Sequence, residues 1–144
     1  MIKEYISCDK GFRNVSIFCS NGKIEITSTY DPNGRLIKQW VYEGNGTNTL
    51  CSAEYDGLGN LVCKYKFFYK LDFLVEKIVL DSNNRVTAKY IYKNDEQGRA
   101  LTAKKYDSNN TLLYYFENVW GEVECLKTTC RNSNGDTINK PFEE

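Results

Sequence analysis

The stretch Tyr30-Asp31-Pro32-Asn33-Gly34-Arg35-Leu36 decides the fold, because it recurs along the chain. Its later copies follow at intervals of 25, 25 and 26 residues, and they begin at Tyr55, Leu80 and Tyr106. Weaker copies flank this series and begin at Phe18 and Asn132, so the repeats cover about residues 18–137. A fixed period of this length indicates a repeat architecture in which each unit is one supersecondary element.

Each copy is typical of a tight turn between two antiparallel strands. Pro32 presets φ for a type I turn, and Gly34 suits the left-handed residue of a bulge. Asn84 and Asn110 replace this glycine in later copies, and asparagine tolerates positive φ better than most residues. A 25-residue unit has room for two strands of about eight residues. We expect further turns at Glu43–Gly46 and Asp95–Gly98.

The repeat also places large side chains at fixed distances after each turn residue. Aromatic residues stand six positions after it, at Trp40, Tyr65, Tyr90 and Phe116. Aliphatic residues stand two positions after it, at Leu36, Leu61, Val86 and Leu112. The residues eight positions after it are Tyr42, Phe67, Tyr92 and Asn118. Even spacings put these side chains on one strand face, which we predict to be the core.

The opposite face of these strands mixes basic residues with apolar ones, and we predict that it faces water. It carries Val62, Lys64, Lys66 and Phe68, and then Arg85, Thr87, Lys89, Ile91 and Lys93. The fold class predicted from this pattern is all-β. We expect a single curled antiparallel meander sheet of about nine to eleven strands, built from hairpin repeats of about 25 residues within one domain, residues 1–144.

Composition agrees with strands and excludes several kinds of chemistry. Aromatic residues make up 14% of the chain and there are two prolines, a balance that favours strands over helices. The absence of histidine excludes Ser-His-Asp catalysis and His-ligated metal. Nineteen basic residues balance nineteen acidic ones, so charge alone indicates neither nucleic acid nor a membrane as partner.

Six cysteines are spread without a Cys-x-x-Cys pair, and they are Cys8, Cys19, Cys51, Cys63, Cys125 and Cys130. We expect free thiols, a cytoplasmic protein, and no metal or cofactor. The Asp-x-Asn-Gly turns lack the glutamate of a calcium loop, since Trp40 and Tyr65 stand at its position.

Three surfaces allow a functional as well as a structural interpretation. The aromatic columns could stack on sugars, although burial in the core is the better account. The lysines of the wet face could bind single-stranded nucleic acid or an acidic protein, or could simply keep the sheet soluble. The carboxylate pairs Glu122 with Glu124 and Asp95 with Glu96 could act as in glycosidases, but neighbours this close favour a solvated edge.

The motif Tyr-Asp-x-x-Gly-x-Leu, present at residues 30–36 and 55–61 and in degraded form twice more, resembles the YD peptide repeat of RHS-type proteins. Those repeats coil a sheet into a shell around polymorphic toxin domains. A chain of 144 residues is too short to enclose a cargo. Small cytoplasmic proteins with such repeats resemble immunity proteins of contact-dependent growth inhibition and other polymorphic toxin systems.

The resemblance therefore implies a bacterial immunity protein without enzymatic activity, whose partner is a cognate toxin domain. If the toxin is a nuclease, its cleft is basic and the inhibitor brings carboxylates to it. The candidate partner-binding residues lie where the repeat degrades, at Asp95, Glu96, Glu117, Glu122 and Glu124. Two alternatives stay open: a component or remnant of an RHS-like shell, and a carbohydrate-binding aromatic repeat module.

Overall fold

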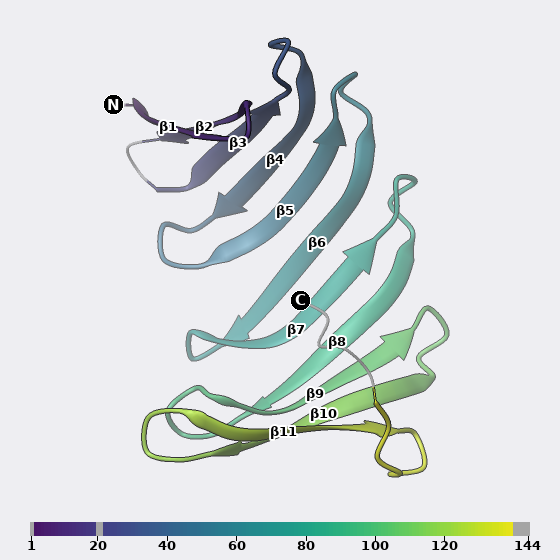
Figure 1. Ribbon diagram of the computed structural model, residues 1–144. Helices are drawn as coiled ribbons and strands as arrows, with labels where there is room; N and C mark the ends of the chain where they lie inside the picture. Colours follow the sequence, from purple (N-terminus) through teal and green to yellow (C-terminus); the bar gives the residue numbers. More distant parts are fainter. Residues whose placement is uncertain (1, 20–21, 140–144) are drawn as a thin grey trace. The chain divides into compact units, whose positions relative to one another are not determined.

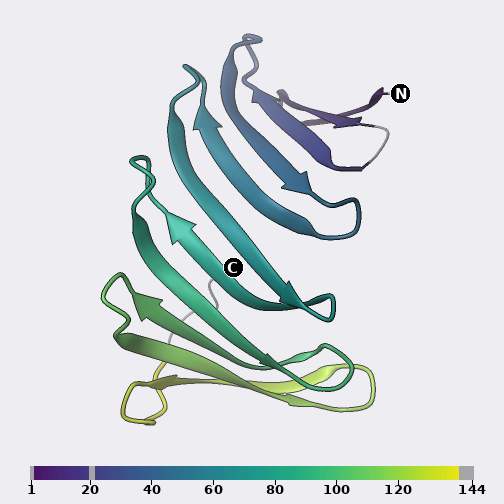
Figure 2. The same ribbon diagram turned by 180° about the vertical axis from the view of Figure 1, so that it is seen from behind.

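A computed structural model of the chain describes residues 2–19 and 22–139 and shows an all-β protein, as predicted. Consecutive strands are neighbours in one antiparallel meander sheet, so the order in the sheet is the order in the sequence (Figures 1 and 2). The eleven strands are β1 (Ile2–Asp9), β2 (Phe12–Cys19), β3 (Ile24–Tyr30), β4 (Leu36–Gly44), β5 (Thr49–Asp56), β6 (Leu61–Lys70), β7 (Phe73–Leu80), β8 (Val86–Asn94), β9 (Ala100–Asp107), β10 (Leu112–Trp120) and β11 (Cys125–Asn132).

The strands divide into two compact units. Unit 1 comprises Met1–Phe67 and Val79–Arg85, and unit 2 comprises Phe68–Ile78 and Val86–Glu144. That the whole chain forms a single domain stays a prediction.

The aspartate of each repeat builds its turn. In the Asp56 turn, Oδ1 accepts hydrogen bonds from the backbone N–H groups of Leu58 and Asn60, both at 2.9 Å. The N–H of Gly59 donates to the Asp56 carbonyl at 3.1 Å. The same pair of bonds to Oδ1 recurs at Asp31, Asp81, Asp95, Asp107 and Asn132. The sequence pattern predicted the turn from its proline and glycine, and this contribution of the aspartate was not foreseen.

The predicted backbone of the turns is confirmed. Gly34 and Gly59 have φ of 81° and 85°, and Asn84 and Asn110 both have φ of 61°. The strand register shifts beside these turns, for example between Thr29 and Tyr30, as expected for a bulge. Two turns with positive φ at other residue types were not foreseen. Lys10, with φ of 51°, precedes Gly11 between β1 and β2, and Leu71 and Asp72 connect β6 to β7 with φ of 51° and 63°.

Unit 1 buries side chains on both faces of its strands. On one face the centroids of the Trp40 and Tyr65 rings lie 6.1 Å apart. Ser52 of β5, the strand between them, is directly opposite Tyr65 and only 4% exposed. On the other face Val41 pairs with Ala53, which is 5% exposed. The prediction that the aromatic face alone forms the core is therefore wrong in unit 1. Small residues on either face become buried because larger neighbours cover them.

Unit 2 has its core on the predicted face. Tyr114, Phe116 and Cys130 are 3%, 5% and 8% exposed, and Ile138 of the C-terminal segment packs against them. Tyr90 is also buried, as predicted, whereas Trp40 and Tyr65 of unit 1 are only half-buried. Val86 was predicted to be core but is 43% exposed, since it is the first residue of β8 and adjoins a turn.

Acid is expected to weaken the turns through their aspartates, most simply at Asp56. The hydrogen bond from the Asn60 backbone, with those from Asn60 Nδ2 and Leu58, outweighs burial and lowers the pKa of Asp56. A carboxyl whose folded pKa is lowered stabilises the fold above its unfolded pKa of about 3.9, and this contribution is lost as pH falls through the folded value. Asp56→Asn keeps the acceptor, as Asn132 shows. We expect the melting temperature of this variant to fall less than that of the wild type between about pH 5 and about pH 2.5.

The control for this experiment is Glu96→Gln, which removes one exposed carboxylate from another turn. Its melting temperature should fall with acid as steeply as that of the wild type. Parallel pH profiles for Asp56→Asn and the wild type would show that Asp56 contributes nothing to the acid response.

Candidate protein-binding surface

Four of the five predicted carboxylates lie at one end of unit 2. Asp95 and Glu96 follow β8, and Glu122 and Glu124 lie between β10 and β11. Arg99 joins the two turns, because its side chain binds Asp95 in one and the Gly121 carbonyl in the other. Glu117 lies apart from them within β10, and its Oε2 pairs with Arg131 Nε at 3.0 Å.

Arg99 holds this end of the unit together. Its Nε donates to Asp95 Oδ2 at 2.7 Å and its Nη1 donates to the Gly121 carbonyl at 2.8 Å. The guanidinium carbon lies 5.3 Å from the centroid of the Trp120 ring, whose Nε1 donates to the Ala100 carbonyl at 2.8 Å. The side chains of Arg99 and Asp95 are 26% and 19% exposed. Asp95 is thus a structural part of the turn. Burial alone would raise the pKa of Asp95, but its hydrogen bonds with Arg99 and Gln97 outweigh this effect and lower the pKa.

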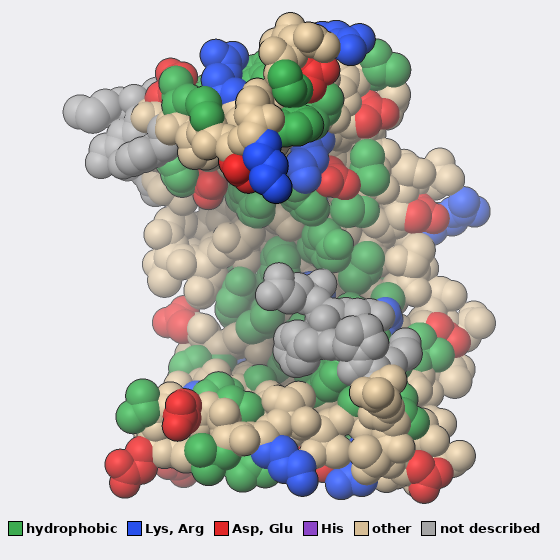
Figure 3. All heavy atoms as spheres, viewed as in Figure 1, with side chains coloured by type: hydrophobic (Ala, Val, Ile, Leu, Met, Phe, Trp, Pro, Cys, Tyr) green, Lys and Arg blue, Asp and Glu red, His purple; other side chains and the backbone are tan. Residues whose placement is uncertain are grey.

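The β10–β11 turn and the strand residues next to it in the sequence carry exposed apolar and acidic side chains. We call Val119, Glu122, Val123, Glu124 and Leu126 the β10–β11 tip. Val119, Val123 and Leu126 are 54%, 90% and 63% exposed, and both glutamates are exposed. Hydrophobic side chains at the surface among charged ones are visible in Figure 3. The two glutamates were predicted as partner-binding residues, whereas the apolar residues were not, although Val123 stands between Glu122 and Glu124 in the sequence.

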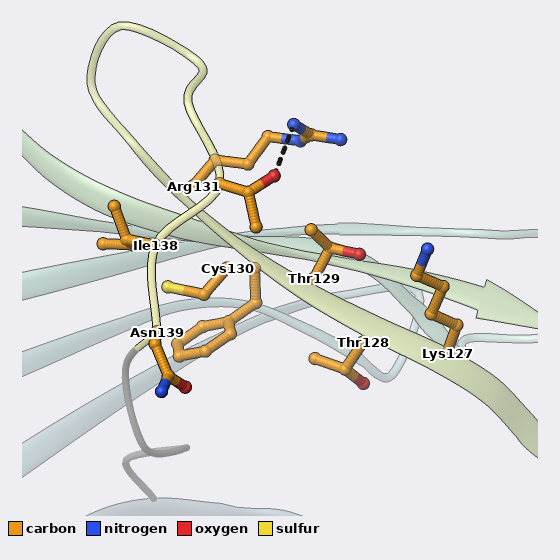
Figure 4. Close-up of a pocket in the computed structure, with 9 residues that line it drawn as sticks. Lys127, Thr128, Thr129, Cys130, Arg131, Ile138 and Asn139 are labelled. Carbon is orange, nitrogen blue, oxygen red and sulfur yellow. Dashed lines mark hydrogen bonds between the residues drawn. The ribbon is translucent and has the colours of Figure 1, made fainter.

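A cavity of about 670 Å³ lies along β11, between this strand and the segment that follows it. Phe116, Cys130 and Ile138 form its apolar wall, and Lys127 and Thr128 line it further along the strand (Figure 4). The segment is held by the N–H of Ile138, which donates to the Cys130 carbonyl at 2.9 Å. Its mixed lining suits an extended peptide better than a small apolar ligand.

A second cluster lies in unit 1 and combines rings with carboxylates. Glu25 of β3 is directly opposite Tyr42 of β4, and Trp40 of β4 is directly opposite Glu54 of β5. The Trp40 and Tyr42 rings are 6.0 Å apart and inclined by 20°. Burial, and then the nearby charge of Glu25, raise the pKa of Tyr42. A cavity of about 160 Å³ adjoins Glu25 and Tyr42. Rings edged by carboxylates are suited to cationic groups.

The predicted basic cluster is divided between the units. Lys64 and Lys66 belong to β6 in unit 1, and Lys89 and Lys93 belong to β8 in unit 2, with β7 between these strands in the sheet order. Arg85 is turned toward Asp81, with Nε 3.5 Å from Oδ2.

Residues 2–19 and 22–139, the part of the chain that the structure describes, offer neither a metal site nor a membrane-spanning helix. No three His, Cys, Asp or Glu side chains gather closely enough there to hold a metal ion. No helix in that part of the chain is long and apolar enough to cross a membrane. All six cysteines are free thiols, and burial is the main cause that raises the pKa of Cys51 and of Cys63.

Residues 18–66 match a family described as a protein of unknown function (DUF2963). The matched segment lies within unit 1 and contains the first weak copy and the first two full copies of the repeat. No curated protein matches the chain.

Proposed function

We propose that this chain is a non-catalytic protein-binding module, and specifically a cytoplasmic immunity protein that neutralises a cognate polymorphic or contact-dependent toxin domain by occluding its working surface. The β10–β11 tip carries the proposal. Exposed Val119, Val123 and Leu126 beside Glu122 and Glu124 combine an apolar anchor with acidic charge. Such a surface suits a partner whose cleft is basic, as in a nuclease.

The base of the tip supports a role in binding. Arg99 fixes the turn through Asp95 and the Gly121 carbonyl, and the Gly121 N–H donates to the Glu124 carbonyl at 2.9 Å. A rigid surface loses little conformational entropy when it docks, so more of the contact energy appears as affinity. The RHS-like repeats supply the association with toxin systems, and this association is one of family resemblance.

The proposal is tested by co-expression and pull-down with the C-terminal domain of a neighbouring toxin gene. We expect the chain to restore growth and to bind that domain with a Kd of about 1 nM or below, through an interface of about 1,600 Å² in total. The combined variant Glu122→Lys, Val123→Asp and Glu124→Lys should bind at least about 100-fold more weakly, because it reverses the charge and removes the anchor.

The matched control is Lys64→Glu with Lys66→Glu, which reverses charge on a strand of unit 1. It should protect as well as the wild type. A toxic, folded domain that neither binds nor is neutralised would disprove the immunity function and favour a component or remnant of an RHS-like shell.

A further inference from the structure

The aromatic positions of the repeat meet different charges in the two units. Trp40 stands six residues after Gly34 and Tyr90 stands six after Asn84, so they are equivalent. In unit 2, Lys77 Nζ lies 4.5 Å and Lys105 Nζ 5.5 Å from the centroid of the Tyr90 ring. Two ammonium groups of the chain itself therefore contact this ring. Attraction between a cation and an aromatic face accounts for the arrangement.

Counting from the turns identifies the residues that take these places beside Trp40. Lys77 stands seven residues before Asn84, and the equivalent residue before Gly34 is Thr27. Lys105 stands five residues before Asn110, and the equivalent residue before Gly59 is Glu54. The register agrees, because Trp40 is opposite both Thr27 and Glu54, as Tyr90 is opposite Lys105. A hydroxyl and a carboxylate thus flank Trp40 where two lysines flank Tyr90.

The surroundings of Trp40 add further negative charge. Glu25 is opposite the neighbouring Tyr42, and Thr27 Oγ1 donates to Glu25 Oε1 at 3.3 Å. The basic residue of β4 on this face is Lys38, which is exposed and lies opposite Asp56. The surface over the two rings is therefore edged by Glu25 and Glu54, while Lys38 lies opposite Asp56 and Lys23 lines the adjoining cavity with Glu25 and Tyr42.

From this comparison we propose that the Trp40 and Tyr42 rings, with Glu25 and Glu54, bind a lysine or arginine side chain presented by the partner protein. Tyr65 already stacks on Trp40, with the ring centroids 6.1 Å apart, so the incoming cation lies along the outer edges of the Trp40 and Tyr42 rings, beside Glu25 and Glu54. The inference rests on the proposed function, since it gives the bound protein a basic side chain that reaches unit 1. This contact site belongs to unit 1, whereas the β10–β11 tip belongs to unit 2.

The site is tested on the full chain with a tetra-arginine peptide as the probe and a tetra-citrulline peptide as its neutral counterpart. The sequence contains two tryptophans, so the indole N–H signals of Trp40 and Trp120 can be followed separately by NMR and assigned with Trp40→Phe. We expect tetra-arginine to shift the Trp40 signal in a saturable way while Trp120 stays unchanged. Tetra-citrulline should leave both signals in place.

Glu54→Lys supplies the ammonium that Lys105 supplies in unit 2, and it should weaken tetra-arginine binding at least about tenfold. Glu25→Gln changes little in shape and should weaken binding about threefold, so it keeps the test valid if Glu54→Lys does not fold. Glu4→Lys makes the same charge change as Glu54→Lys at an exposed position of β1 and should bind like the wild type.

Three results would overturn the inference: no shift of Trp40 with tetra-arginine, an equal shift with tetra-citrulline, or a shift that neither Glu54→Lys nor Glu25→Gln weakens. A Trp40 shift with cellotetraose but not with tetra-arginine would also overturn it, and would indicate a sugar-binding surface. This assay needs no toxin. Failure here with successful neutralisation removes the unit 1 site alone, whereas failure of neutralisation with a positive result here removes the immunity function.

Discussion

Phe116→Ala is expected to lower the free energy of unfolding by about 3–5 kcal/mol, the usual cost of removing a buried aromatic side chain. Phe116 is 5% exposed, and it lies between Ala103 on β9 and Cys130 on β11. Neither neighbour is large enough to fill the space that the ring leaves. Ile138 would lose part of its packing surface as well. Urea denaturation followed by circular dichroism measures the loss.

The control for this prediction is Leu113→Ala on the same strand. Leu113 is 42% exposed, and it lies at the register shift between β9 and β10. Its replacement should cost less than about 1 kcal/mol. Similar small losses for both variants would mean that the cluster around Phe116 is not the core of unit 2.

Arg99→Ala is expected to lower the free energy of unfolding by roughly 1.5–3 kcal/mol, as for other hydrogen bonds made by charged groups. The substitution removes the side-chain donor to Asp95 Oδ2 and to the Gly121 carbonyl, and it uncovers the Trp120 ring. The β10–β11 turn then loses its fixed connection to the β8–β9 turn. If the tip binds the toxin domain, dissociation from that domain should also become faster.

Arg35→Ala is a matched control for Arg99→Ala, because Arg35 Nε pairs with Asp31 four residues earlier at 3.3 Å in an equivalent turn. The Arg35 side chain is 78% exposed, so its pair is screened by water and should contribute little. Chemical denaturation of both variants gives the comparison. Equal losses would contradict the view that the Gly121 and Trp120 contacts distinguish Arg99.

Much of the fold could be predicted because turn chemistry and strand alternation are local properties. Gly34, Gly59, Asn84 and Asn110 all have the positive φ that their residue types favour. Leu71 and Asp72 adopt the same region in a turn whose sequence does not indicate it. There the chain must reverse direction within two residues between the neighbouring strands β6 and β7, which local preference does not reveal.

Burial and the candidate site were harder to predict, because both depend on neighbours across strands. The alternation of strand residues predicted that both Val86 and Leu112 are buried in the core, yet Val86 is exposed. Charge alone could not separate Asp95, which binds Arg99 inside a turn, from Glu122 and Glu124, which are exposed. The Trp40 and Glu54 pair could have been found by counting from Gly34 and Gly59.

The identity between sheet order and sequence order has a consequence for how such chains diversify. Each strand pairs with the strands that directly precede and follow it in the sequence, so a gene duplication or loss of about 25 codons would add or remove one hairpin and leave the other pairings in place. The number of repeats can therefore change while each remaining hairpin keeps its own strand register. Divergence between copies, such as lysine at 105 and glutamate at 54, then changes the charge of the surface while the strand pairings are kept.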